Sequence, residues 1–250
     1  MLAYIFLALG LVSLTLFCVC RDKKSSTVAI CWKTLTSVFF VATAIAATVY
    51  NKEGLLVSAL LMVGGLVMGL IGDITLDFKI FLKGLPYEKA ESDADNMTYI
   101  GMAAFAVGHI LYITAATLRS PASKLTLLWS ALVAIGLVAC IFALSITVMK
   151  MRFGKYLIPS VLYAFLLSWF VVYSVWQTAI VGASVANVLL LVGAIMFIVS
   201  DLILSMTYFS KEEDYKKEGF LNPESKFMIV SNHVTYYIAQ FAIAVAIMFI

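Results

Sequence analysis

Runs of about 20 apolar residues recur along the whole length of this 250-residue chain. An α-helix of that length crosses the hydrocarbon core of a bilayer, which is about 30 Å thick. Hydrophobic residues make up 63% of the chain and charged residues 12%, so a water-soluble domain of this size would lack the polar side chains to cover it. The sequence therefore predicts a polytopic membrane protein. Its spans are helices, because strands of a membrane barrel would be shorter and would alternate apolar with polar residues.

We expect a single all-α domain of eight transmembrane helices, at residues 2–20, 28–49, 55–82, 98–118, 125–147, 155–174, 184–209 and 227–249. The first is a retained span, because basic residues follow its apolar run and do not precede it as in a signal peptide. The third span is over-long, and we expect its last turns, with Asp77, Lys79 and Lys83, to emerge at the membrane interface. Two long loops, 83–97 and 210–226, are candidate lids.

Basic residues indicate how the chain is oriented, since they concentrate in cytoplasmic loops. The loops after odd-numbered spans carry thirteen: Arg21, Lys23, Lys24, Lys79, Lys83, Lys89, Lys150, Arg152, Lys155, Lys211, Lys216, Lys217 and Lys226. The loops after even-numbered spans carry Lys52, Arg119 and Lys124. Both termini are therefore expected on the non-cytoplasmic side. The compact loops favour a bacterial inner membrane.

Acidic residues inside the spans mark the candidate site. Gly72-Asp73-Ile74-Thr75-Leu76-Asp77 places two carboxylates four residues apart, on one face of a helix. Asp201 occurs in a similar setting, Ser200-Asp201-Leu202-Ile203-Leu204. An ionisable group at membrane depth costs about 2.5 to 3.5 kcal/mol on insertion scales, so it indicates function by default. The similar settings also suggest a 4+4 internal duplication.

The orientation places further polar residues near the two aspartates. Asp73 and Asp201 each lie about two-thirds along spans that run inward, so they should share one depth in the cytoplasmic half. The residues in the first half of the returning spans reach the same level: Lys33, Ser160, Tyr163, His233, Tyr236, Tyr237 and Gln240, with His109 nearer the middle. Polar groups from six spans thus converge on one level, which predicts a pocket within the membrane.

Several motifs, in this order, resemble the YhhN family of lysoplasmalogenase-type membrane hydrolases. They are Lys33-Thr34, Gly72-Asp73-x-x-Leu76, Phe105-x-x-Gly108-His109-x-x-Tyr112, Tyr163, Ser200-Asp201-x-x-Leu204 and Tyr236-Tyr237-x-Ala239-Gln240. The chain departs from the family at Leu35, where proline is common. The resemblance implies an eight-helix fold and hydrolysis of the vinyl-ether bond of lysoplasmalogens. The products would be a fatty aldehyde and glycerophosphocholine or glycerophosphoethanolamine, and Asp73 and Asp201 would be the catalytic pair.

The chemistry of that reaction suggests further roles. Vinyl-ether hydrolysis needs one acid to protonate carbon and one carboxylate to stabilise the cation and activate water. The sequence leaves open which aspartate does which, and we expect no metal or other cofactor. Lys33, the only Lys or Arg inside a span, would bind the phosphate or pair with an aspartate. The other candidate substrate-binding residues are Asp77, His109, Tyr163, Ser200, Tyr237 and Gln240. The expected partners are a lysophospholipid, water and membrane lipid, without nucleic acid, since the net charge of +3 is small and scattered.

Structural roles and other functions compete with this hypothesis. Asp77 is as readily an interfacial residue, His109 a core histidine and His233 an interfacial one. Tyr112 and Tyr236 fit packing or lipid-facing aromatics. Gly64, Gly65, Gly69 and Gly72 fit close helix packing, and the four cysteines (Cys18, Cys20, Cys31 and Cys140) fit packing positions. A proton-coupled transporter or a non-catalytic lipid-binding protein are the alternative functions.

Overall fold

The computed structural model describes residues 1–21, 27–50, 55–120, 123–216 and 218–250, and within these ranges it is all-helical without a strand. Eight helices are long and apolar enough to span a membrane, as the sequence predicted. They are α1 (Leu2–Cys20), α2 (Thr27–Ala47), α3 (Leu56–Lys83), α4 (Ala90–Arg119), α5 (Lys124–Thr147), α6 (Leu157–Trp176), α7 (Val185–Phe209) and α9 (Lys226–Ala246). Short helical turns precede or extend some of them: η1 (Thr48–Tyr50), η2 (Gly154–Tyr156), η3 (Gln177–Val181) and η4 (Ile247–Phe249).

The predicted spans agree with these helices to within a few residues, except at one end of α4. This helix begins at Ala90, so the expected loop 83–97 is mostly helix. Its first turn carries Glu91 and Asp93, which favour a helix N-terminus, and Ala90 and Ala94 are buried against the bundle. Hydropathy detects only the apolar part of such a helix. The segment 210–226 contains a short helix that the sequence did not predict, α8 (Glu212–Lys216).

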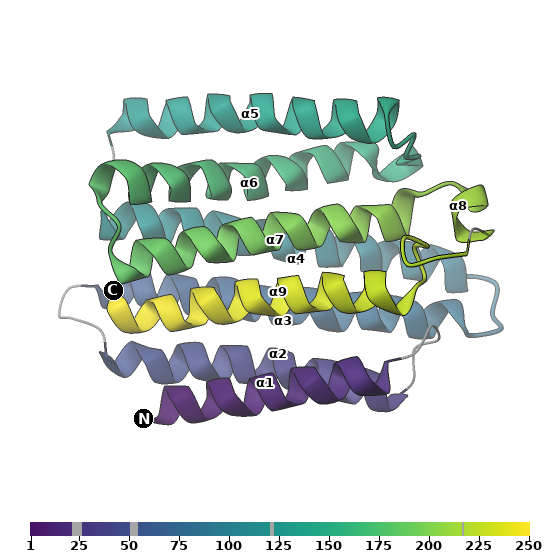
Figure 1. The fold of residues 1–250 in the computed structure, drawn as a ribbon, viewed down its shortest axis with the longest axis horizontal. Helices are drawn as coiled ribbons and strands as arrows, with labels where there is room; N and C mark the ends of the chain where they lie inside the picture. The colour runs from purple at the N-terminus through teal and green to yellow at the C-terminus, as the bar shows by residue number, and fades with distance from the viewer. Residues whose placement is uncertain (22–26, 51–54, 121–122, 217) are drawn as a thin grey trace.

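The long helices run side by side in one bundle (Figure 1). Three close pairs organise it, namely α1 with α2, α3 with α4, and α7 with α9. Helices α1 and α5 lie at opposite edges of the bundle (Figure 1). Leu128, Trp129 and Val133 of α5 are more than half exposed, as expected for a face covered by lipid. Both termini lie at one end of the bundle and α8 at the other (Figure 1).

Small residues allow α3 and α4 to approach closely. A Cβ on Gly65 would lie 2.3 Å from the Tyr112 ring, and one on Gly108 would lie 3.1 Å from the Gly65 carbonyl oxygen. A side chain at either position would force the helices apart, which is why small residues are enriched where membrane helices contact. The packing role predicted for Gly65 is confirmed. The helix pair that it holds together carries Asp73.

The count of basic residues in loops needs one correction. Lys79 is only 7% exposed within α3, so it does not belong to a loop. Lys83, by contrast, is exposed at the end of α3. Four other residues of the count lie outside the described part of the chain: Lys23, Lys24, Lys52 and Lys217. The expected orientation in the membrane and the expected duplication stay predictions.

Candidate active site

A cavity of about 600 Å³ opens within the bundle, and both Asp73 and Asp201 line it. Residues of all eight long helices line it, so residues far apart in the sequence meet there. The lining continues to Tyr215, Pro223 and Glu224, which belong to α8 and the segment after it. The cavity therefore extends from the two aspartates toward the α8 end of the bundle. Segment 210–226 contributes to its wall, in line with the lid suggested from the sequence.

Asp73 is held by two hydroxyl groups from neighbouring helices. Its Oδ2 atom accepts hydrogen bonds from Ser37 Oγ of α2 (2.7 Å) and from the Tyr236 hydroxyl of α9 (2.9 Å). The Tyr237 hydroxyl lies 2.9 Å from Ser37 Oγ and donates to the Lys33 carbonyl oxygen at 3.0 Å. Asp73 is 4% exposed, and this network satisfies a carboxyl group that water reaches poorly.

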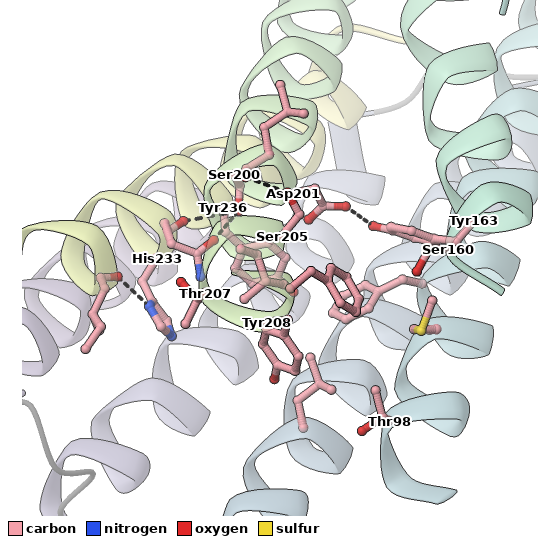
Figure 2. A pocket seen from close by; sticks show the side chains of 18 of the residues that line it. Thr98, Ser160, Tyr163, Ser200, Asp201, Ser205, Thr207, Tyr208, His233 and Tyr236 are labelled. Carbon is pink, nitrogen blue, oxygen red and sulfur yellow. Dashed lines mark hydrogen bonds between the residues drawn. The ribbon is translucent and has the colours of Figure 1, made fainter. Parts of the chain in front are cut away.

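Asp201 accepts fewer hydrogen bonds than Asp73 from the described residues. Tyr163 of α6 donates a hydrogen bond to its Oδ2 atom, and Figure 2 shows the two side chains pointing toward one another. The Tyr163 hydroxyl also lies 3.5 Å from the His109 Nε2 atom, so Tyr163 stands between Asp201 and His109 in this chain of polar contacts. Ser160, one turn before Tyr163, also lines the cavity, and its buried hydroxyl has no hydrogen-bond partner among the described residues. A polar ligand atom in the cavity would satisfy it.

Lys33 and Asp77 form a buried ion pair on the same cavity. The Lys33 Nζ and Asp77 Oδ1 atoms are 2.7 Å apart, and the two side chains are 10% and 11% exposed. Of the two roles that the sequence left open for Lys33, the structure therefore supports pairing with an aspartate. Asp77 is buried within the bundle, because the four-residue spacing places it on the same helix face as Asp73. The expected emergence of these turns at the membrane interface stays a prediction.

Lys79 was also expected at the interface, and it too is buried. It lines the cavity, and its Nζ atom lies 3.9 Å from the centroid of the Tyr208 ring of α7. The two lysines of this region thus differ in environment. Lys33 contacts a carboxylate, whereas Lys79 contacts an aromatic face.

The structure brings most of the predicted site residues to the cavity. Six of them line it, namely Lys33, Asp73, Asp77, Tyr163, Ser200 and Asp201. Ser200 turns its hydroxyl to α9, where it donates to Asn232 Oδ1 at 2.8 Å. The other three, His109, Tyr237 and Gln240, are buried behind the wall.

Gln240, which lies behind the cavity wall, supports two tyrosines by hydrogen bonds. Its Nε2 atom donates to the Tyr236 hydroxyl at 2.8 Å, and its Oε1 atom accepts from Tyr112 at 3.2 Å. Tyr236 and Tyr112 are therefore neither lipid-facing nor purely packing residues. His233, expected at the interface, lines the cavity, with its ring 4.7 Å from that of Phe17.

Sequence reasoning missed Ser37 and Asn232 as site residues, and it placed Tyr236 at the level of the pocket without giving it a role there. A signal for them was present, because Ser37 follows Lys33 by four residues and Asn232, Tyr236 and Gln240 repeat at the same spacing. Polar residues four apart on an apolar helix share one inward face. Within the described ranges, no three histidine, cysteine or acidic side chains cluster as a metal site.

A model of the YhhN family matches residues 28–247, which is most of the chain. The protein belongs to the YhhN family. The matched region contains the whole cavity wall except Phe17 and Arg21. Neither a search of curated proteins nor a search of solved structures found a match. This YhhN protein is thus a multi-pass membrane protein by its family and by its eight apolar helices.

Proposed function

We propose that this YhhN protein hydrolyses the vinyl-ether bond of lysoplasmalogens, giving a fatty aldehyde and a glycerophospho-base. The observation that carries the proposal is that two acidic residues in opposite halves of the chain, Asp73 and Asp201, line one cavity within a bundle of apolar helices. Neither carboxyl group has a cation within hydrogen-bonding distance among the described residues, so neither is committed to an ion pair. Carboxyl groups placed in this way favour acid–base chemistry on a substrate that lies in the bilayer.

The cavity fits a lipid substrate. Its volume of about 600 Å³ is within the usual range of about 300 to 1,000 Å³ for ligand sites. Apolar side chains such as Leu76, Met102 and Leu167 share the wall with the polar groups. An alkenyl chain would contact these, while the ether oxygen and glycerol would lie beside the hydroxyl groups. The Ser160 hydroxyl, which no described residue binds, is available for such a contact.

The hydrogen bonds suggest which aspartate is the acid. Asp73 accepts hydrogen bonds from two hydroxyl groups, which stabilise a carboxylate. Asp201 accepts from Tyr163 alone within the described chain, so its anion is the less stabilised. Two charged carboxylates sharing a cavity of low dielectric are costly, so one proton is retained. We therefore assign Asp201 as the proton donor and Asp73 as the base.

The reaction then balances with water as the only other reactant. Asp201 transfers its proton to the β-carbon of the vinyl ether, and the electron pair of the double bond forms the new C–H bond. The resulting oxocarbenium ion lies near the Asp73 carboxylate, which stabilises it and takes a proton from the attacking water. The protonated Asp73 then gives its proton to the ether oxygen of the hemiacetal, and the C–O bond breaks to release the glycerophospho-base. The hemiacetal hydroxyl transfers its proton to the Asp201 carboxylate as the aldehyde C=O forms, so both aspartates return to their starting states.

Aldehyde release by the purified protein tests this proposal. We expect wild-type protein to release aldehyde from 1-alkenyl-glycerophosphocholine and not from its saturated 1-alkyl analogue. D73N and D201N should each lower turnover by a factor of about 10² or more, as for loss of an acid or base. E91Q, which changes an exposed acid at the start of α4, is the matched control. Liposomal lipid or proton flux without any aldehyde would instead support a carrier.

A further inference from the structure

Lys79 is a buried cation without an anionic partner in the described part of the chain. It is 7% exposed, lines the cavity, and has the Tyr208 ring as its contact at 3.9 Å. Asp95 of α4 acts on it electrostatically, but the Asp95 carboxylate is already bound by Lys155 and Tyr156. A cation over an aromatic ring gains about 0.5 to 2 kcal/mol, less than the several kcal/mol that burying an ammonium costs. An anion in the cavity would supply the missing interaction.

Lys33 does not compete for this role, because its ammonium is bound to Asp77 at 2.7 Å. Displacing that contact would leave a buried carboxylate unpaired. Two further basic residues, Arg21 and Lys83, line the cavity with Lys79. Of the other acids on the wall, Asp77 is already paired with Lys33, and Glu224 is exposed. Beyond the Lys33–Asp77 pair, the cavity wall therefore carries three basic side chains, of which Lys79 is buried.

The spacing along α3 fits a lysophospholipid. Lys79 follows Asp73 by six residues, which is about 9 Å of helix at 1.5 Å per residue. In the proposed substrate, seven bonds separate the vinyl β-carbon from phosphorus, about 9 Å when extended at roughly 1.25 Å of advance per bond. Tyr208 follows Asp201 by a similar distance on α7. A substrate with its vinyl ether between the aspartates would therefore place its phosphate at the level of Lys79 and Tyr208.

We propose that Lys79, supported by Tyr208, binds the phosphate of a lysophospholipid head group. The assignment deepens the proposed function, since it names the residue that recognises the head group of the same substrate. Lys33, in this account, holds Asp77 and helps to position Asp73. The phosphate diester gives charge-assisted contacts to Lys79 that a neutral lipid of the same chain length cannot make.

Binding of a lipid that cannot react separates this proposal from the proposed function. The probe is radiolabelled 1-O-hexadecyl-glycerophosphocholine, which has no vinyl ether, bound to the protein in nanodiscs and detected by scintillation proximity. Unlabelled probe, 1-O-hexadecylglycerol and inorganic phosphate serve as competitors. Wild-type protein should prefer the phospholipid over the alkylglycerol by about tenfold or more, the size of one charge-assisted contact.

Substitutions at two lysines give the expected contrast. K79Q should reduce the preference to about threefold or less while binding the alkylglycerol as wild type does, which also shows that it is folded. K79R keeps the charge and should keep most of the preference. K89Q removes an exposed lysine outside the cavity and should change nothing.

The other outcomes contradict the proposal. A preference that persists in K79Q would place phosphate recognition elsewhere, and loss of both ligands in K79Q would make the residue structural. Competition by inorganic phosphate, with no preference for the phospholipid over the alkylglycerol, would mean that free phosphate is the ligand. If the binding preference follows Lys79 but no aldehyde is released from lysoplasmalogen, this assignment stands and the proposed function fails.

Discussion

The buried ion pair between Lys33 and Asp77 makes a quantitative prediction. Its Nζ and Oδ1 atoms are 2.7 Å apart and both side chains are about nine-tenths buried. Removing one partner leaves an uncompensated charge, which typically costs about 3 to 5 kcal/mol, whereas replacing both by apolar residues is often neutral. K33M and D77L should therefore each destabilise by about 3 kcal/mol or more, and the double variant K33M/D77L by clearly less than either single variant.

This coupling is measured by unfolding the wild type, the two single variants and the double variant in mixed micelles. Dodecyl sulfate is the titrant, and tryptophan fluorescence follows the unfolding. The expected coupling free energy between the two residues is about 3 kcal/mol or larger, with the double variant more stable than additivity allows. Ser58→Ala, which changes a buried hydroxyl bonded to the Ala115 carbonyl oxygen 2.6 Å away, gauges the cost of an ordinary polar contact. Additive effects of K33M and D77L would refute the pairing. They would also remove the argument that Lys33 is occupied by Asp77 and leaves phosphate binding to Lys79.

Two further predictions concern packing and orientation. G65A should destabilise the protein by about 1 to 3 kcal/mol in the same unfolding titration, because its Cβ would lie 2.3 Å from the buried Tyr112 ring. G136A, whose Cβ would have nothing within 4 Å, should be neutral. Equal effects of the two substitutions would contradict the tight packing of α3 on α4. In intact cells, a cysteine at Ala183 should react with a membrane-impermeant maleimide and one at Lys89 should not, because positive loops face the cytoplasm; the reverse labelling would invert the orientation.

The fold was largely predictable because hydropathy alone decides where a chain crosses a bilayer. The bounds of seven of the eight long α-helices were predicted to within a few residues at both ends. The exception was the start of α4, where a charged turn continues the helix beyond its apolar part. The short helix α8 was missed for a related reason. Its sequence, Glu-Glu-Asp-Tyr-Lys, has no apolar face to reveal it.

The sequence identified many of the residues that line the cavity, but not the direction in which their side chains point. Counting residues along each span placed Asp73 and Asp201 at one level, and both line the cavity. Depth does not say which way a side chain points around its helix. Tyr236 therefore fitted a packing aromatic equally well, although it donates to Asp73.

Lysines show the same limit. A lysine near the end of a span usually extends to the interface, which is what hydropathy suggested for Lys79. Its burial depends on Tyr208, which is 129 residues later in the chain and becomes a neighbour only through the packing of α3 near α7. The pairing of Lys33 with Asp77 was one of two options that the sequence left open, and only the packing of α2 against α3 decides between them.

Hydrolysis of 1-alkenyl-glycerophosphocholine in D₂O, with mass spectrometry of the released aldehyde trapped as it forms, tests the central claim most directly. If a carboxylic acid protonates the vinyl β-carbon, each aldehyde carries one deuterium at C2, and D73N and D201N release none above background. Aldehyde without deuterium at C2, or wild-type rates in both variants, would contradict the account.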